Sequence, residues 1–309
     1  MVVLWLVIGA VSAYIAAASL QDIPFLQGIL EPFKSYIPGE KAMYSPLAYF
    51  FLLSVTALLE RKIPVREQPV LSVSLAQDAL WYIGTLALRI TFLAGYTAFL
   101  YHIYHEYLSG LTIEAASNWH PIVRFIVALL VTDFFRWLSH LIIHKVPVFW
   151  VFHEVHHSQT NLNIFTDARV HPVDRMISGT IKFVPMLMLD NALPIIMAWA
   201  IFETIYPKFY HANVRLNLGP LRYILVTPQS HRIHHGVGPT YHDKNFGFTF
   251  CLWDRMFGTQ HQDHEDYPET GIIDNDYPQE QNAGPAALLK TFCLQLFYPF
   301  QKLSRMLRY

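Results

Sequence analysis

The sequence predicts an all-α fold: a polytopic integral membrane helical bundle of about four spans plus a re-entrant hairpin, with a cytosolic helical and loop cap. Three observations support this class. Hydrophobic residues make up 53% of the 309 residues, and the mean hydropathy is +0.27. Charged residues make up only 15%, well below the ~25% of soluble proteins. Several apolar runs approach the ~20 residues that a helix needs to cross a bilayer.

Charge and cysteine content exclude some classes of partner. The formal net charge is −1, so no basic excess indicates a nucleic-acid partner. The two cysteines, Cys251 and Cys293, form no CxxC pair and no disulfide framework. A chain with so few thiols is compatible with a site that faces the cytosol.

Four apolar runs are predicted to span the membrane. Residues 1–20 carry no charge, and no basic residue precedes Leu4 as a secretory signal peptide would require. This run is therefore predicted to be a retained membrane helix. Further apolar runs of near-spanning length cover 43–59, 79–101 and 121–143.

Basic residues in the short loops predict the orientation of these spans. Arg61, Lys62 and Arg66 follow the second run, whereas 102–120 contains neither Lys nor Arg. The loop after the second run is therefore predicted to be cytoplasmic. It follows that the C-terminal end of the 121–143 helix also lies at the cytoplasmic face.

The later segments complete the predicted bundle. Residues 176–206 are apolar, too long for one span and too short for two, which predicts a re-entrant hairpin that returns to the cytoplasmic face. Residues 207–285 are polar and predict the cytosolic cap. The tail, 286–309, is apolar with basic residues. A helix on the bilayer surface and a packed terminal helix both remain open for it.

Histidines gather in three boxes, spaced HxxxH, HxxHH and HxxHH. Spacings of three and four place side chains on one face of a helix. Histidine is the commonest metal ligand, and imidazole suits Zn, Cu, Fe and Ni. One tetrahedral metal takes about four ligands, so eight histidines predict two metal ions. The box residues are His140, His144, His153, His156, His157, His231, His234 and His235.

The ordered motifs resemble those of the fatty acid hydroxylase and sterol desaturase superfamily of integral membrane oxygenases. The resemblance covers about residues 80–260. With the apolar runs on either side, the predicted division is N-terminal membrane spans and a cytosolic loop at 1–78, a fatty acid hydroxylase-like catalytic domain at 79–285 and an interfacial C-terminal helix at 286–309. The matching stretches are DFFR (133–136) before the first box, FWVFHEVHHS (149–158), NIFTDARVHP (163–172), FYHANV (209–214), TPQSHRIHH (227–235), NFG (245–247) and LWDRMFGT (252–259).

This resemblance implies a histidine-bound di-metal site at the cytoplasmic face. It implies two iron ions, with zinc as an alternative in purified protein, and O2 as co-substrate. The eight box histidines are then the catalytic ligands, and His211 matches a position where relatives place a further ligand. His171 and His242 are additional candidate ligands. Asp133, seven residues before His140, is a candidate partner for an imidazole, as are Asp167, Asp243 and Asp254.

The implied activity is oxidation of a lipid C–H bond, with hydroxylation preferred and desaturation left open. Such a bond needs an oxidant that amino acids cannot supply and that iron and O2 together can. The sequence shows no fused haem or flavin motif. Electrons are therefore predicted to come from an external donor, such as a cytochrome b5- or ferredoxin-type protein. A fatty acyl chain, a sterol-like molecule and an ether lipid all remain open as substrates.

Three alternatives compete. HEVHH at 153–157 satisfies HExxH, in which Glu154 would be the general base of an intramembrane zinc metalloprotease, but this leaves the other boxes unexplained. A non-catalytic metal transporter would place polar residues along a path through the membrane, whereas the boxes gather at one end. Ether-cleaving members of the superfamily carry an acidic residue directly after the first box, where this chain has Lys145.

Overall fold

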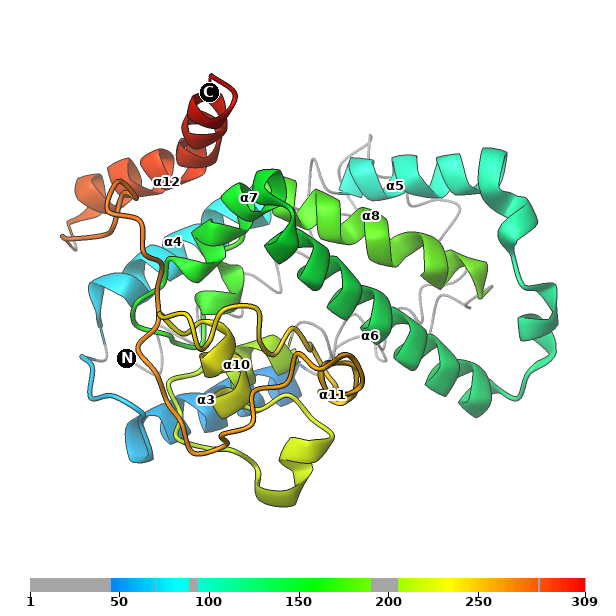
Figure 1. Ribbon diagram of the computed structural model, residues 1–309, viewed down its shortest axis with the longest axis horizontal. Helices are drawn as coiled ribbons and strands as arrows, with labels where there is room; N and C mark the ends of the chain where they lie inside the picture. Colours follow the sequence, from blue (N-terminus) through cyan, green and yellow to red (C-terminus); the bar gives the residue numbers. More distant parts are fainter. Residues whose placement is uncertain (1–45, 70, 89–93, 190–204, 283, 309) are drawn as a thin grey trace.

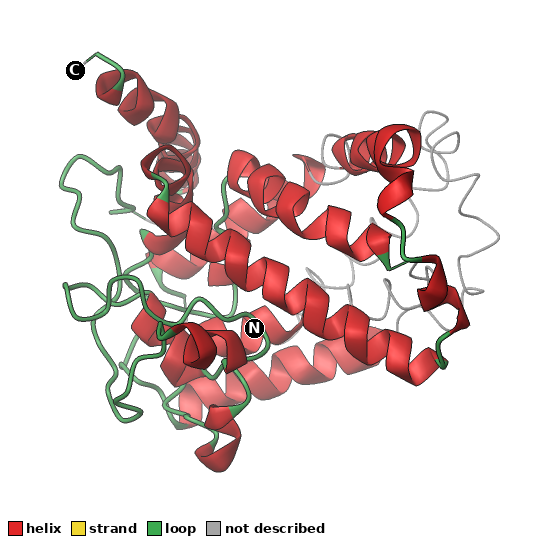
Figure 2. Cartoon of the chain, turned by 45° about the vertical axis from the view of Figure 1, so that its right-hand side comes forward, coloured by secondary structure: helices red, strands yellow, loops and turns green. Residues whose placement is uncertain are grey.

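A computed structural model of the chain describes residues 46–69, 71–88, 94–189, 205–282 and 284–308. Within these ranges every regular element is a helix (Figure 2). Extended pairing is limited there to isolated bridges such as Leu225 with Phe250. The all-α prediction is therefore confirmed for the described part. The predicted span at 1–20 and most of the return of the predicted hairpin, 190–204, lie outside the described residues.

The described residues contain nine α-helices with full bounds and several short helical segments. The α-helices are α3 (Pro46–Lys62), α4 (Val73–Leu88), α5 (Ala94–Ile103), α6 (Pro121–Lys145), α7 (Pro147–His157), α8 (Pro172–Met188), α10 (Pro228–His234), α11 (Leu252–Phe257) and α12 (Pro285–Met306). The short segments are η3 (Tyr104–Leu108), η4 (Ser109–Leu111), η5 (Glu114–Asn118), η6 (Thr166–Ala168) and η7 (Gly219–Tyr223). Residues 205–211 are also helical.

Proline fixes where the helices of the histidine region begin. Pro147, Pro172 and Pro228 each lie in the first turn of their helix, where a missing N–H costs nothing. The residue before a proline is restricted to extended backbone. Val146 accordingly ends α6 and begins α7, with φ −98° and ψ 111°. This one-residue corner brings the first histidine box against the second.

The long helix α6 is the axis of the fold. It packs against α7 and α8, and α12 packs against α4 and α7 (Figure 1). Residues 122–145 are the one stretch among the described residues that is long and apolar enough to cross a membrane. The predicted fourth run is thus a helix of the expected length. The bundle of four spans stays a prediction.

The other apolar runs form shorter helices in the described part. α3 has 17 residues, and the run at 79–101 is divided between α4 with 16 residues and α5 with 10. Exposed apolar side chains remain on α3 and on the first turns of α6, including Phe51, Ile122 and Ile126.

Two buried carboxylates attach the polar cap to α6. Asp133 accepts from the backbone N–H of Thr249 at 2.9 Å and from the indole of Trp253 at 2.9 Å. Asp254, on α11, accepts from Trp137 of α6 at 3.0 Å and from the N–H of Phe246 at 2.9 Å. The loop 245–259 is therefore fixed onto the end of α6 that carries the first histidine box.

The C-terminal helix α12 is packed on one side and exposed on the other. Gln295, Tyr298 and Pro299 are buried against the rest of the molecule. Phe297 is 57% exposed and Leu289 is 55% exposed. The buried face agrees with a packed terminal helix, and the exposed apolar face agrees with a helix on the bilayer surface.

Candidate metal centre

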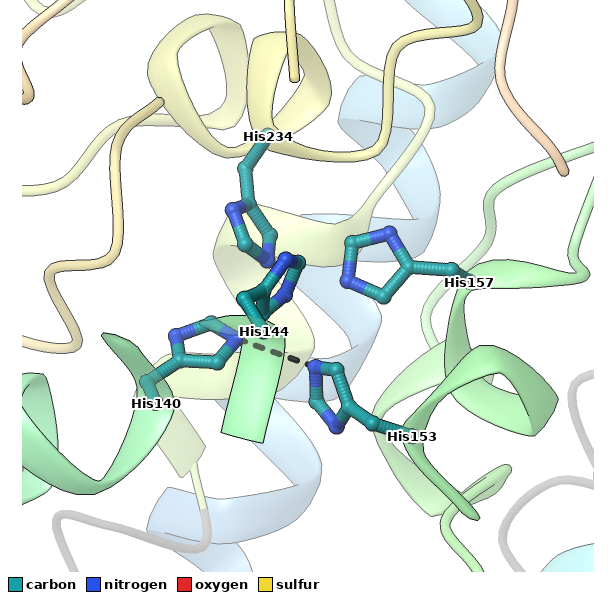
Figure 3. A group of neighbouring side chains, drawn as sticks. All are labelled: His140, His144, His153, His157 and His234. Atoms are coloured by element: carbon teal, nitrogen blue, oxygen red, sulfur yellow. Dashed lines mark hydrogen bonds between the residues drawn. The ribbon is translucent and has the colours of Figure 1, made fainter. Parts of the chain in front are cut away.

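The structure brings nine histidines together in two adjoining groups. In each group the ring nitrogens lie within 4.8 Å of one another. The five-histidine group contains His140, His144, His153, His157 and His234, and Figure 3 shows their rings turned toward a common centre. The four-histidine group contains His156, His211, His231 and His235. All eight box residues and His211 are present.

Each HxxHH box supplies ligand atoms to both groups. On α7, His153 and His157 are four residues apart and belong to the five-histidine group, whereas His156 belongs to the other. Neighbouring residues on a helix point about 100° apart, so adjacent histidines cannot serve one centre equally. The spacing of the box is therefore what allows one short helix to reach two centres.

The third box repeats this pattern with the groups exchanged. His231 and His235, four residues apart, belong to the four-histidine group, and His234 belongs to the five-histidine group. α10 begins at a capping box in which Thr227 and Ser230 bond each other's backbone N–H. This cap fixes the start of a helix only seven residues long, which alone would be unstable.

His211 enters the site from a separate segment. The helical turns at 205–211 bring its Nε2 to 2.8 Å from His231 Nε2 and 3.1 Å from His156 Nε2. The side chain is 3% exposed. The structure thus places His211 with the box histidines, as the resemblance implied.

Protein acceptors set the tautomer of three rings in the five-histidine group. Nδ1 of His140 lies 2.9 Å from the Phe246 carbonyl, and Nδ1 of His234 lies 2.9 Å from the Lys244 carbonyl. Nδ1 of His153 lies 2.8 Å from the Asp174 carboxylate. Carbonyls and carboxylates only accept, so each Nδ1 donates, and Nε2 is left to bind a metal.

Carbonyls alone do the same in the four-histidine group. Nδ1 of His156 lies 3.2 Å from the Arg169 carbonyl, and Nδ1 of His211 lies 2.7 Å from the Pro207 carbonyl. Burial lowers the pKa of His211 to about 4 and holds the pKa of His156 well below its usual value of 6.5. Both rings are therefore neutral near pH 7, the form that binds metals.

These contacts give a test of whether the residues fit metal ions. Nε2 of His156 and Nε2 of His211 face each other at 3.1 Å, yet each ring has its single proton on Nδ1. Two lone pairs at this distance repel unless a cation lies between them. Buried polar atoms are normally bonded, but three Nε2 atoms of the five-histidine group have no hydrogen-bond partner. They are His144 Nε2, His157 Nε2 and His234 Nε2. The site therefore fits metal ions.

Two additional candidate ligands lie outside both groups. His171 caps the start of α8: its Nδ1 accepts from Val173 N–H at 3.2 Å, and its Nε2 lies 3.0 Å from the Leu296 carbonyl. Both of its nitrogens are thus used by the protein. His242 is exposed and belongs to neither group. The predictions of these two residues as ligands do not agree with the structure.

The acids proposed as imidazole partners have other roles. Asp133 bonds the loop at 249–253 and not a histidine. Asp167 is paired with Lys208 at 2.9 Å, and Asp243 with Lys145 at 2.5 Å. Asp254 supports His140 indirectly. It accepts from the N–H of Phe246, and the carbonyl of Phe246 accepts from His140 Nδ1. The prediction for Asp133 was wrong because a loop 116 residues downstream occupies its carboxylate.

The carboxylate that does bond a histidine is Asp174, which sequence reasoning missed. It lies in the first turn of α8 and is buried, with its Oδ2 at 2.8 Å from His153 Nδ1. The available signal was its place just after the histidine–proline pair at 171–172. A helix that begins at this proline presents Asp174 to α7, on which it packs.

The metalloprotease alternative does not agree with the position of Glu154. Its Oε2 accepts from Lys302 of α12 at 2.6 Å, so this carboxylate is held by the C-terminal helix. The general base of an HExxH site must instead face the water bound by the metal. His153 and His157 also share their group with three further histidines.

Comparison with known proteins agrees with this geometry. The sequence model of the fatty acid hydroxylase family matches residues 125–259. Alkylglycerol monooxygenase of Xenopus tropicalis is 36% identical over 134 residues, 43% of this chain and 29% of the relative. Human alkylglycerol monooxygenase is 29% identical over 262 residues, 79% of this chain and 56% of the relative. Ornithine lipid hydroxylase OlsE of Rhizobium tropici is 26% identical over 190 residues, 61% of this chain and 54% of the relative.

These matches cover only part of the length of each relative. They span between 29% and 56% of the length of these relatives. No solved structure matches the chain. The matched region contains the nine clustered histidines, and the relatives are named as monooxygenases or hydroxylases. Residues 125–259 are therefore similar to the fatty acid hydroxylase family, in agreement with the resemblance of the histidine boxes.

Proposed function

We propose that this chain is a membrane-bound non-haem di-iron monooxygenase that uses O2 to hydroxylate an unactivated C–H bond of a lipid. The observation that carries the proposal is the pair of buried histidine groups, five and four residues strong. They lie inside a domain whose relatives are named as monooxygenases of alkylglycerol and a hydroxylase of ornithine lipid.

The composition of the two groups favours iron. All nine side chains are imidazoles, which suit Zn, Cu, Fe and Ni. Zinc is almost always tetrahedral with four ligands in structural sites, and one group offers five histidines. The chemistry required, oxidation of an alkyl C–H bond, is open to iron and closed to redox-inactive zinc.

The proposed reaction is RH + O2 + 2 e⁻ + 2 H⁺ → ROH + H2O. When bound, the iron pair supplies the activation of O2. The protein fixes the orientation and tautomer of the ligand rings through the Nδ1 contacts to Phe246, Asp174 and Arg169. The proposed source of the electrons is a separate donor protein of the cytochrome b5 or ferredoxin type.

The position of the site supports a substrate that lies in a membrane. His140 and His144 are at the C-terminal end of α6, the apolar helix long enough to cross a bilayer. Met256 and Phe257 of α11 are exposed apolar residues beside it, with the Phe257 ring stacked on Trp137 at 4.7 Å. These exposed apolar residues support contact of this end of the domain with lipid. The basic residues Arg61, Lys62 and Arg66 support a cytoplasmic location for this end.

Hydroxylation is preferred over ether cleavage on one local feature. The residue after the first box is Lys145, and it is paired with Asp243 on the cap. The acidic residue of ether-cleaving members is therefore replaced by a cation that the fold already uses.

The test is mass spectrometry of lipids from cells that express the chain, grown under ¹⁸O2. The expected product is a lipid with one added oxygen atom that carries the label. Cells with His231→Ala, which removes one of the four ligands in its group, should lack this product. A labelled product that persists in the variant, or metal-loaded wild-type protein that oxidises no lipid with a donor present, contradicts the proposal. Loss of two hydrogens without added oxygen indicates a desaturase.

A further inference from the structure

Arg169 is a fully buried cation next to the metal centre. Its side chain is 0% exposed and lies between η6 and α8. Nε donates to Asp78 Oδ1 at 2.6 Å. Nη2 and Nη1 donate to the two carboxylate oxygens of Glu280 at 2.8 Å and 3.1 Å. Such bidentate contacts fix a guanidinium in one orientation.

The backbone of the same residue orients a candidate ligand. The Arg169 carbonyl accepts from Nδ1 of His156 at 3.2 Å, and His156 belongs to the four-histidine group. His231 Nδ1 and His235 Nδ1 in that group are buried without a hydrogen-bond partner. The Arg169 carbonyl is thus one of two protein groups, with that of Pro207, that orient rings there in the described part of the chain.

Two segments outside the family match hold Arg169 in place. Asp78 lies on α4, and its Oδ2 also accepts from Asn163 at 2.8 Å. Glu280 precedes α12 and accepts from Gln295 of that helix at 3.2 Å. Gln295 in turn accepts from Trp81 of α4 at 2.8 Å. The family match ends at residue 259 and begins at 125, so both anchors are additional to it.

The three charges also complement the metal. Asp78 and Glu280 contribute two negative charges and Arg169 one positive charge, and all three side chains are at most 4% exposed. The net charge of −1 lies behind a ligand set that is neutral. A buried cation is stable only when it is paired or coordinated. This cluster therefore offsets part of the charge that a metal ion brings to the four-histidine group.

We propose that Arg169, anchored by Asp78 and Glu280, is a positioning residue that sets the metal affinity of the four-histidine group. Through it, α4 and α12 complete a metal position that the matched domain does not complete alone. The inference rests on the proposed function only in that the histidine groups bind metal. A purely structural ion cluster is the competing explanation. It would lower stability without favouring one metal position over the other.

The experiment measures metal content against a chelator with the full-length protein loaded with Fe²⁺. Glu280→Gln keeps the shape of the side chain and removes its charge. We expect it to release one of the two ions at a free-metal level about 10- to 100-fold higher than the wild type, the usual effect of a partner behind a ligand. Glu269→Gln is the matched control, because its pair with Arg66 is exposed. It should behave as the wild type.

Two further variants assign the effect and protect against misfolding. Arg169→Lys keeps the charge but loses the bidentate contact, and it should weaken the same ion to a smaller degree. In a His231→Ala background, which already lacks the ion of the four-histidine group, Glu280→Gln should cause no further loss. Retention of both ions at wild-type affinity in Glu280→Gln overturns the proposal. Equal loss of both ions in step with unfolding also overturns it. Selective loss in a protein whose wild type oxidises no lipid overturns the proposed function alone.

Discussion

The two histidine groups use the same boxes but are supported differently. The five-histidine group draws its rings from α6, α7 and α10, and one of them, His153, is bonded directly to a carboxylate, Asp174. Among the described residues, the rings of the four-histidine group bond only carbonyls, and the carboxylates of Asp78 and Glu280 reach the group through Arg169. In the five-histidine group, the negative charge is thus on a residue bonded directly to a histidine. In the four-histidine group, the negative charges are on residues bonded to Arg169, whose carbonyl contacts His156. The two positions should respond to different substitutions.

The largest effects should follow from removing one ligand from each group. His157→Ala and His231→Ala each delete a ring from a different group. Each should lose one ion and reduce product formation by more than about 100-fold, beyond the usual range for partners behind a ligand. Metal analysis and lipid mass spectrometry on the same preparation check this. A variant with both ions and normal turnover would remove its histidine from the ligand set.

Asp174→Asn should weaken the five-histidine group selectively. The amide oxygen can still accept from His153 Nδ1, but the negative charge is lost. We expect about 10- to 100-fold weaker binding of one ion, with the other ion unchanged. The chelator titration used for Glu280→Gln measures this, and the two variants should affect different ions. Asp276→Asn, at an exposed pair with Arg305, is the control. Equal effects of the two buried variants on both ions would mean that the groups are supported as one unit.

Glu154→Gln tests a residue that lies among the ligands without facing the metal. The amide oxygen can still accept from Lys302, but the charge of the pair is lost, while Asp274 keeps that lysine at 2.7 Å. The free energy of unfolding should fall by about 1 kcal/mol, because a hydrogen bond to a charged acceptor becomes one to a neutral acceptor. Both ions should stay, and product formation should change by no more than about threefold, because a catalytic proton carrier would contribute at least about 100-fold. Complete loss of activity with both ions retained would instead support Glu154 as a general base in an HExxH site.

Local geometry explains which parts of this comparison the sequence could predict. Spacings of three and four residues indicate helical faces, so the shared face of His140 and His144 and that of each HxxHH box could be predicted, whereas the convergence of the three boxes was implied by the family resemblance. The start of each short helix followed from proline, as at Pro147. The division of the boxes between two groups depends on how α6, α7 and α10 cross, and no periodicity in the chain encodes that crossing.

Contacts between distant segments could not be predicted in the same way. Asp133 is in register with His140 on α6, yet its carboxylate bonds a loop 116 residues away. Arg169 lies in the NIFTDARVHP stretch (163–172), yet its partners lie 91 and 111 residues from it. Loops that bring such residues together have no repeating pattern. The apolar runs before α6 were read as spans from length alone, and the described helices there are shorter.

The smallest effects should come from substitutions of the two candidate histidines that lie outside both groups. His171→Ala removes the acceptor for Val173 N–H at the start of α8 and should cost about 0.5–2 kcal/mol of stability, as other N-caps do. His242→Ala changes an exposed side chain and should stay within about 0.5 kcal/mol of the wild type. Thermal unfolding and metal analysis of both variants check this. Both ions should remain bound in each, because neither ring reaches the clustered nitrogens. Loss of an ion from His242→Ala would mean that the loop at 241–244 closes over the site and adds a ligand when metal is bound.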